Sequence, residues 1–329
     1  MKKNESLTWT QALGRTPGPE SPRAALILYA KGLCMGCADV VPGVSGGTIA
    51  LITGIYEKLL AAIKSFDVEF TKKLFRLDIK AALATAHVRF LVILLAGIAT
   101  AIISLARIMH HLLLTHPVLT WSLFFGLILA SIHVVSRKVP SWRRAGTIFS
   151  FVAGTAAAWI IVGLIPVSTP ETWWFIFISG FIAICAMILP GLSGAFLLLI
   201  LGKYEFITGA IKNPLLMDNM IIMIIFCAGA AAGVISFSRL LKWALDRWHD
   251  LAMAFLAGLM TGSLRKIWPW KETLETTVVR GKVHVLQEAN ILPPDFGAGF
   301  WMAVLLALTG FAAVIALERL SSGKPRQRR

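Results

Sequence analysis

Two copies of one short motif carry the residues best suited to chemistry in this chain of 329 residues. The motif reads Pro-Gly-x-Ser-Gly and occupies residues 42–46 and 190–194. Proline disfavours continuation of a preceding helix, and glycine permits a turn whose backbone amides converge on one point. A helix that restarts after such a turn presents free amides and the positive end of its dipole, with serine near its N-cap. The motif therefore predicts two sites for phosphate or another anion.

We expect the anion-binding groups to come from these two turns and from two arginines. A guanidinium can bind phosphate through two hydrogen bonds, although an arginine at a helix end also reaches the membrane surface without any ligand. For the turns, the structural alternative is that glycine merely lets two helices pack closely. The predicted phosphate-binding residues are Gly43, Ser45, Gly46, Gly47, Thr48, Gly191, Ser193, Gly194, Arg107 and Arg239.

Four charged residues within or beside the apolar segments are predicted to have coupling or gating roles, because charge inside a membrane is costly and usually functional. They are Lys31, Asp39, Glu57 and Glu205. Lys31 and Asp39 flank the first turn, and a static ion pair is the alternative to a proton-carrying role for Asp39. The two glutamates are expected at the ends of the helices that follow the turns, where anchoring at the membrane surface is the alternative.

The composition indicates which elements must position these residues. Hydrophobic residues make up 57% of the chain and charged residues only 15%, against roughly 25% charged in a soluble domain, which excludes a soluble globular enzyme. The net charge is +15, and the lysines and arginines that produce it lie between the apolar runs. This placement indicates the charge bias of membrane-protein loops and not nucleic-acid binding. Six spans of the length that a membrane requires are predicted at residues 90–106, 117–135, 146–165, 220–238, 250–264 and 299–318. Two further apolar segments, 24–57 and 174–202, are interrupted by the motif.

The two interrupted segments share many identical residues at a constant offset along the chain, as in Gly32 and Gly180. A weaker match continues downstream and relates Arg107 to Arg239. Each half then has one interrupted element and three crossings, and because three is odd the second half must be inverted in the membrane. We predict an all-α polytopic membrane protein with an inverted-topology repeat, in which each half is a re-entrant or broken-helix hairpin plus three transmembrane helices.

Basic residues assign the loops to the two sides of the membrane, because cytoplasmic loops are enriched in lysine and arginine. The predicted organisation is a cytoplasmic tail (1–23), a first repeat (24–165), a second, inverted repeat (166–320) and a basic cytoplasmic tail (321–329). Both termini are therefore expected in the cytoplasm. The 265–298 loop is expected outside, with Trp268 and Trp270 at the membrane interface and no assigned role.

Over residues 32–48 and 190–194 the chain resembles the polyprenyl-phosphate transporter family, and the resemblance extends over nearly its whole length. The resemblance implies a protein of the bacterial or archaeal cytoplasmic membrane that returns undecaprenyl phosphate, the lipid carrier of envelope glycans, to the inner leaflet. We expect it to do so by alternating access. The residues alone indicate only an anion-handling inverted-repeat transporter, and the substrate comes from the resemblance.

Two other functions fit part of the pattern. Integral-membrane undecaprenyl-pyrophosphate phosphatases have similar turns, but an arginine follows their serine where this chain has Gly46 and Gly194. A small-anion transporter satisfies the same physical argument without a lipid. We expect no enzyme, because the chain lacks a recognisable catalytic set, and we expect no cofactor or metal. The expected partners are the polyprenyl phosphate lipid and membrane lipids, without nucleic acid, and homo-oligomerisation stays open.

Overall fold

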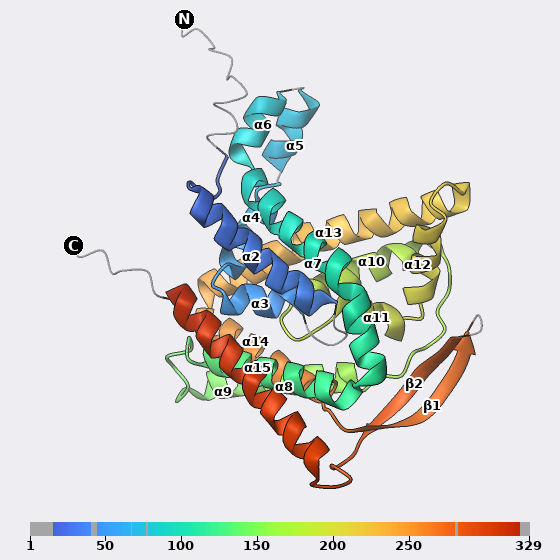
Figure 1. Ribbon diagram of the computed structural model, residues 1–329. Coiled ribbons are helices and arrows are strands. Elements are labelled where there is room, and N and C mark those ends of the chain that lie inside the picture. The colour runs from blue at the N-terminus through green and yellow to red at the C-terminus, as the bar shows by residue number, and fades with distance from the viewer. Residues whose placement is uncertain (1–15, 41–44, 67, 77, 280–281, 323–329) are drawn as a thin grey trace, which may run out of the picture.

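The structure is a computed structural model that describes residues 16–40, 45–66, 68–76, 78–279 and 282–322. Most of these residues are helical (Figure 1). The first half contains α2 (Pro22–Asp39), α3 (Gly46–Ile52), α4 (Tyr56–Lys64), α5 (Val68–Phe75), α6 (Ile79–Thr85), α7 (Val88–Thr115), α8 (Pro117–Ser136) and α9 (Ala145–Val162). The second half contains α10 (Trp173–Ile188), α11 (Gly194–Ile200), α12 (Tyr204–Lys212), α13 (Met217–Arg247), α14 (His249–Ser263), β1 (Lys271–Val279), β2 (Lys282–Asn290) and α15 (Ala298–Ser322).

Both motifs interrupt a helix. In the first half α2 ends at Asp39, and α3 begins after Ser45, whose extended backbone and side chain form its N-cap. In the second half α10 ends at Ile188, and α11 begins after Ser193 in the same way. Local sequence explains this arrangement, because a serine with extended backbone satisfies amides that a helix start would leave unpaired.

A second bend follows each short helix and was not expected from the sequence. The chain turns by 115° between α3 and α4 and by 112° between α11 and α12. Gly54 and Gly202 make these turns with φ of 70° and 62°, a left-handed conformation that favours glycine. Glu57 and Glu205 therefore lie in the first turns of α4 and α12, so their expected position at the ends of the preceding helices was wrong.

Helices occupy all six predicted spans. Within the described residues, five are long and apolar enough to cross a membrane, namely α7, α8, α9, α13 and α15, and the two bent pairs raise the number to seven if each is one span. The sixth predicted span, 250–264, is α14, which has only 15 residues. Large apolar side chains such as Ile103, Phe149 and Trp301 are exposed on the outer helices, as expected for surfaces in contact with lipid.

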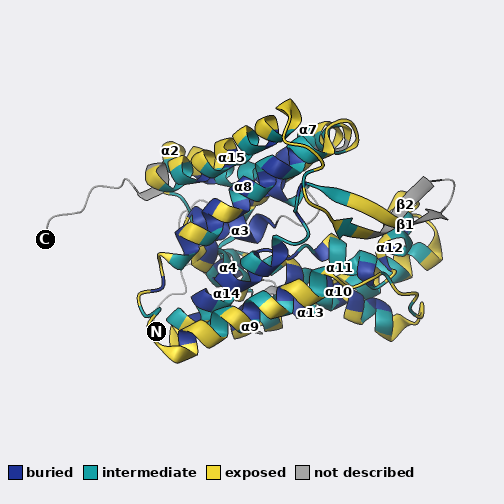
Figure 2. Cartoon of the chain, turned by 90° about the horizontal axis from the view of Figure 1, so that it is seen from below, coloured by how far each residue is buried: buried dark blue, intermediate teal, exposed yellow. Residues whose placement is uncertain are grey.

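The helices pack in pairs, α2 with α7, α10 with α13, α8 with α15 and α9 with α14, around a buried centre that contains α3 and much of α14 (Figure 2). The α9–α14 and α8–α15 pairs join the two halves of the chain, and in both the helices run parallel. Near the start of the α9–α14 pair, the Ser150 hydroxyl donates to the Leu251 carbonyl, and near its end the Arg265 guanidinium donates to the Trp159 carbonyl. In the α8–α15 pair, Gly126 faces Ala307, and further along both helices the His133 ring lies 6.4 Å from that of Phe311.

The 265–298 region contains an antiparallel β-hairpin, which corrects the all-α prediction. Its strands pair from Lys271 with Asn290 to Val279 with Lys282. The run of β-branched residues at the end of β1, 276–279, was the available signal. At the base of the hairpin, Trp268 and Trp270 pack against rings of α8 and α15. The hairpin lies on the opposite side of the molecule from the start of α2 and the end of α15 (Figure 1).

Candidate functional site

The two interrupted segments, far apart in the sequence, contact each other directly. The Ser45 hydroxyl donates a hydrogen bond of 3.2 Å to the carbonyl of Leu189, in the second break. The Thr48 hydroxyl accepts a hydrogen bond of 3.1 Å from the amide of Gly191. Three of the predicted phosphate-binding residues, Ser45, Thr48 and Gly191, are therefore neighbours, although 143 positions separate Thr48 from Gly191.

A third contact crosses the same junction from the start of α4. The buried Tyr56 hydroxyl donates a hydrogen bond of 3.0 Å to the Ile188 carbonyl, at the end of α10. We expect Tyr56→Phe to lower the free energy of unfolding by about 2 kcal/mol, because the carbonyl loses its donor inside the protein. Thermal unfolding in detergent measures the change. The control is Tyr29→Phe, whose hydroxyl donates to the Thr100 hydroxyl, because Thr100 keeps its own hydrogen bond to the Ala96 carbonyl. Equal losses in both variants would contradict the assignment.

The amides at the start of α3 already have partners within the chain. The Asp39 carboxylate accepts a 2.7 Å hydrogen bond from the Gly46 amide, and the Ser45 hydroxyl accepts one from the Gly47 amide at 3.1 Å. A carboxylate at this position also interacts favourably with the positive end of the helix dipole. An external anion can reach these amides only if it displaces Asp39.

The start of α11 is less fully paired. Among the described hydrogen bonds, the Ser193 hydroxyl accepts one long bond of 3.4 Å from the Phe196 amide and donates none. The position that matches Asp39 in the repeat is occupied by Met187, which supplies no carboxylate. The two turns are therefore unequal, and at the second the serine hydroxyl has no described acceptor.

Two lysines hold the other end of α3. The Lys31 ammonium donates to the Thr53 carbonyl at 2.7 Å, and the Lys138 ammonium donates to the Leu51 carbonyl at 3.0 Å. Cations near the C-terminus of a helix satisfy its last carbonyls and oppose the negative end of its dipole. Lys31 and Asp39 thus act at opposite ends of α3. Sequence reasoning missed Lys138, which comes from the loop after α8.

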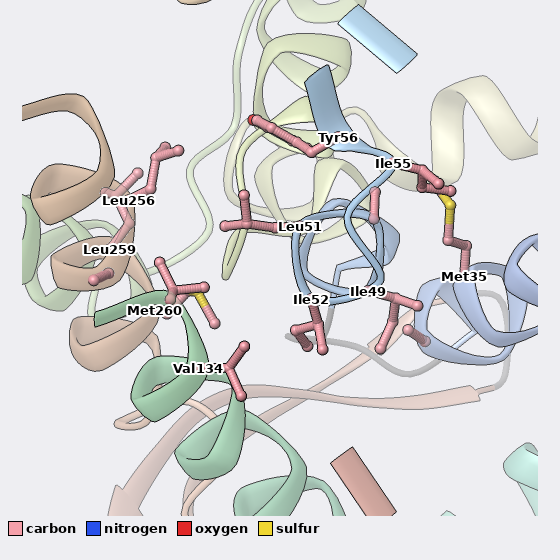
Figure 3. Close-up of a cluster of buried hydrophobic side chains, with 14 of the residues drawn as sticks. Met35, Ile49, Leu51, Ile52, Ile55, Tyr56, Val134, Leu256, Leu259 and Met260 are labelled. Atoms are coloured by element: carbon pink, nitrogen blue, oxygen red, sulfur yellow. The ribbon is translucent and has the colours of Figure 1, made fainter. Parts of the chain in front are cut away.

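The surroundings of α3 are tightly packed and apolar. All seven of its residues are buried. Figure 3 shows Leu51 and Ile52 among side chains that include Val134 of α8 and Met260 of α14. Because such a site excludes water, each polar group at the junction depends on a protein partner or a ligand.

The remaining predicted residues do not join this cluster. Arg107 is exposed on α7 and Arg239 is half-buried on α13, and no described hydrogen bond or ion pair links either of them to the turns. Glu57 is exposed at the start of α4, whereas Glu205 is half-buried at the start of α12. Gly43 lies outside the described residues.

Comparisons with known proteins identify relatives that match most of the chain. Residues 35–284 match a family model described as undecaprenyl phosphate translocase-like. A polyprenyl-phosphate transporter of Vibrio cholerae is 42% identical over 301 residues, which cover 89% of this chain and 96% of the relative. A polyprenyl-phosphate transporter of Staphylococcus aureus is 30% identical over 253 residues, which cover 73% of this chain and 84% of the relative. No solved structure matches the chain.

Proposed function

The chain belongs to the undecaprenyl phosphate translocase-like family, and we propose that it moves undecaprenyl phosphate across the cytoplasmic membrane toward the inner leaflet. Its relatives and its apolar helices identify it as a multi-pass membrane protein that transports polyprenyl phosphate. The observation that carries the mechanism is the direct contact between the two broken segments through Ser45, Thr48 and Gly191.

The physical task is to carry a charged headgroup through a medium that cannot hydrate it. An unpaired ion costs many kcal/mol in hydrocarbon, so hydroxyl and amide groups must replace its water. We assign this role to the predicted phosphate-binding residues of the two turns, while the prenyl chain stays in lipid. Arg107 and Arg239 are proposed to meet the headgroup before and after it reaches the turns, since no described contact ties them to the junction.

The direction of the paired helices supports the inverted repeat. α9 contains the third predicted span of the first half and α14 the second predicted span of the other half, so they would run antiparallel if both halves had the same orientation. They run parallel, and so do α8 and α15. The inverted orientation also supports re-entrant elements. In that arrangement α9 ends and α13 begins on the same side of the membrane, so the segment from α10 to α12 must begin and end on that side.

In this proposal both termini face the cytoplasm and the β-hairpin faces outward. The support is the basic composition of the loops and the position of the hairpin, which lies away from the start of α2 and the end of α15. Alternating access then means that the contacts of Ser45 and Thr48 with the second break open toward each leaflet in turn.

The test is translocation by purified protein in vesicles that contain polyprenyl phosphate, measured as the fraction of headgroups accessible from outside. Ser193→Ala is expected to reduce the rate about tenfold, because a hydroxyl that can donate to phosphate is lost while its only described bond is long. Ser193→Thr keeps the hydroxyl and is the matched control. A wild-type rate equal to that of empty vesicles would contradict the function, and normal transport by Ser193→Ala would contradict the site.

A further inference from the structure

A cationic cavity lies beneath the β-hairpin. Its volume is about 440 Å³, and it is bounded by the end of α9, by α11 and by the base of the hairpin. Arg265, Lys266 and Lys271 line it, and Glu288 is the only carboxylate among the described lining residues. The cavity therefore has an excess of two positive charges, which matches the charge of a phosphate monoester dianion.

The cations are held in place by the surrounding side chains. The ammonium groups of Lys266 and Lys271 lie 3.1 and 3.2 Å from the same Glu288 oxygen, Oε2. The Lys271 side chain is only 9% exposed, and its ammonium lies 4.4 Å from the centre of the Trp121 ring. Rotamers fixed in this way lose little entropy when a ligand binds.

Arg265 is fixed by a different set of contacts. Its guanidinium lies 4.9 Å from the centre of the Trp159 ring and donates to the Trp159 carbonyl at 3.1 Å. Its own carbonyl accepts a hydrogen bond from the Asn290 side chain, so the second strand of the hairpin fixes the backbone as well. A stacked guanidinium with further donors is well suited to bind phosphate.

The electrostatics of the cavity favour an additional anion. Burial lowers the pKa of Lys271 to about 8, although Glu288 opposes this shift, and neighbouring Lys266 adds to it. Glu288 therefore compensates only part of the unfavourable effect of burial and of Lys266 on the ammonium form of Lys271. A bound dianion would stabilise the ammonium form, and its binding energy includes this gain.

The cavity also lies beside the second turn of the proposed transport site. Phe196 lines it, and the Lys266 ammonium lies 5.0 Å from the centre of the Phe196 ring. The amide of Phe196 is the group that donates to the Ser193 hydroxyl. A headgroup in the cavity is thus separated from the turn by a single residue of the first turn of α11.

The segment that leads into the hairpin also lines a second, apolar cavity. Trp268 and Trp270 line a second cavity of about 260 Å³ together with Phe300 of α15 and Phe125 of α8. Lys271, the next residue, lines the cationic cavity. The cationic cavity matches the anionic head of an amphiphile and the apolar cavity matches an isoprenoid chain, whereas free phosphate matches the cationic cavity alone.

We propose that the cationic cavity binds the phosphate monoester headgroup of a lipid on the hairpin side of the protein, before or after passage through the two turns. Arg265, Lys266 and Lys271 bind the phosphate, and Glu288 is the internal counter-ion that the phosphate replaces. The assignment of a lipid as the ligand rests on the proposed function.

The experiment measures calorimetrically the binding of farnesyl phosphate to the purified protein in detergent. Lys271→Gln is expected to weaken binding about tenfold, because one charge-assisted hydrogen bond is lost. Glu288→Gln is expected to tighten binding severalfold, because the lysines then lack a competing carboxylate. The opposite signs separate ligand binding from structural damage, which would weaken binding in both variants. Lys242→Gln, which removes the partner of Asp246 on α13, is the matched control and should bind as the wild type does.

Inorganic phosphate and farnesol are the two further probes. Farnesol should bind at least tenfold more weakly than farnesyl phosphate and should not respond to Lys271→Gln. If inorganic phosphate binds as tightly as farnesyl phosphate with the same dependence on Lys271 and Glu288, the lipid assignment is overturned. Unchanged farnesyl phosphate affinity in Lys271→Gln and Glu288→Gln would overturn the assignment of the cavity as the binding site. If vesicles with wild-type protein nevertheless transport the lipid, the proposed function survives that outcome.

Discussion

Replacement of Asp39 by alanine is expected to lower polyprenyl phosphate translocation about 100-fold in reconstituted vesicles. The carboxylate is the partner of the Gly46 amide at the start of a fully buried helix. Without it the amide is unpaired in an apolar environment and the helix dipole loses its counter-charge. A loss of about 3 kcal/mol at the junction, which is the proposed transport site, corresponds to roughly a 100-fold change in an equilibrium constant.

Asp39→Asn is the matched control, because its amide oxygen can still accept the hydrogen bond from Gly46. If Asp39 acts mainly as the helix cap, the asparagine variant keeps at least a tenth of the wild-type rate. If Asp39 also carries a proton, as the sequence suggested, the same variant loses any response of the rate to an imposed pH gradient. Wild-type transport by Asp39→Ala would show that the cap is dispensable and would remove Asp39 from the mechanism.

Gly229→Ala is expected to lower the free energy of unfolding by about 3 kcal/mol. A Cβ at this position of α13 would collide with the Phe177 carbonyl oxygen of α10, and backbone atoms of a packed helix cannot move aside cheaply. The thermal midpoint of the purified protein in detergent reports the loss. Translocation should fall in parallel, because the α10–α13 pair positions the second turn.

Gly299→Ala provides a control with the opposite sign. This glycine also lies in a helix, α15, but no atom is found within 4 Å of its added Cβ. Alanine there should leave stability unchanged or raise it by up to about 1 kcal/mol, because alanine is the better helix former. If both glycine variants lose stability equally, close helix approach does not explain the requirement at Gly229.

The matching glycines of the two halves illustrate how much a sequence repeat can predict. Gly32 and Gly97 face each other where α2 meets α7. Gly180 and Gly229 occupy the α10–α13 interface, each against a carbonyl of the other helix. The repeat correctly marked equivalent positions, but their shared function is close packing. These glycines lie outside the turns, so their packing role leaves the turns themselves as the proposed anion site.

The sequence by itself determined the first break of each interrupted segment, at the Pro-Gly-x-Ser-Gly motif, and showed that the chain is a membrane protein with several spans. These features depend on local chemistry, since proline, glycine and a serine cap act within a few residues, and apolar runs of membrane length need no partner to be recognised. The β-hairpin was also encoded locally, in the β-branched run of β1, but the length of the 265–298 loop had suggested no structure.

Only the tertiary structure decided which groups meet. Ser45 bonds to a carbonyl 144 positions away, and Lys138 reaches the end of α3 across 87 positions. The cationic cavity combines residues from α11, the end of α9 and both strands of the hairpin. Such contacts depend on how whole helices pack, and that packing is set by many weak, non-directional contacts spread along the chain. Local patterns specify the ends of each element, but not its neighbours.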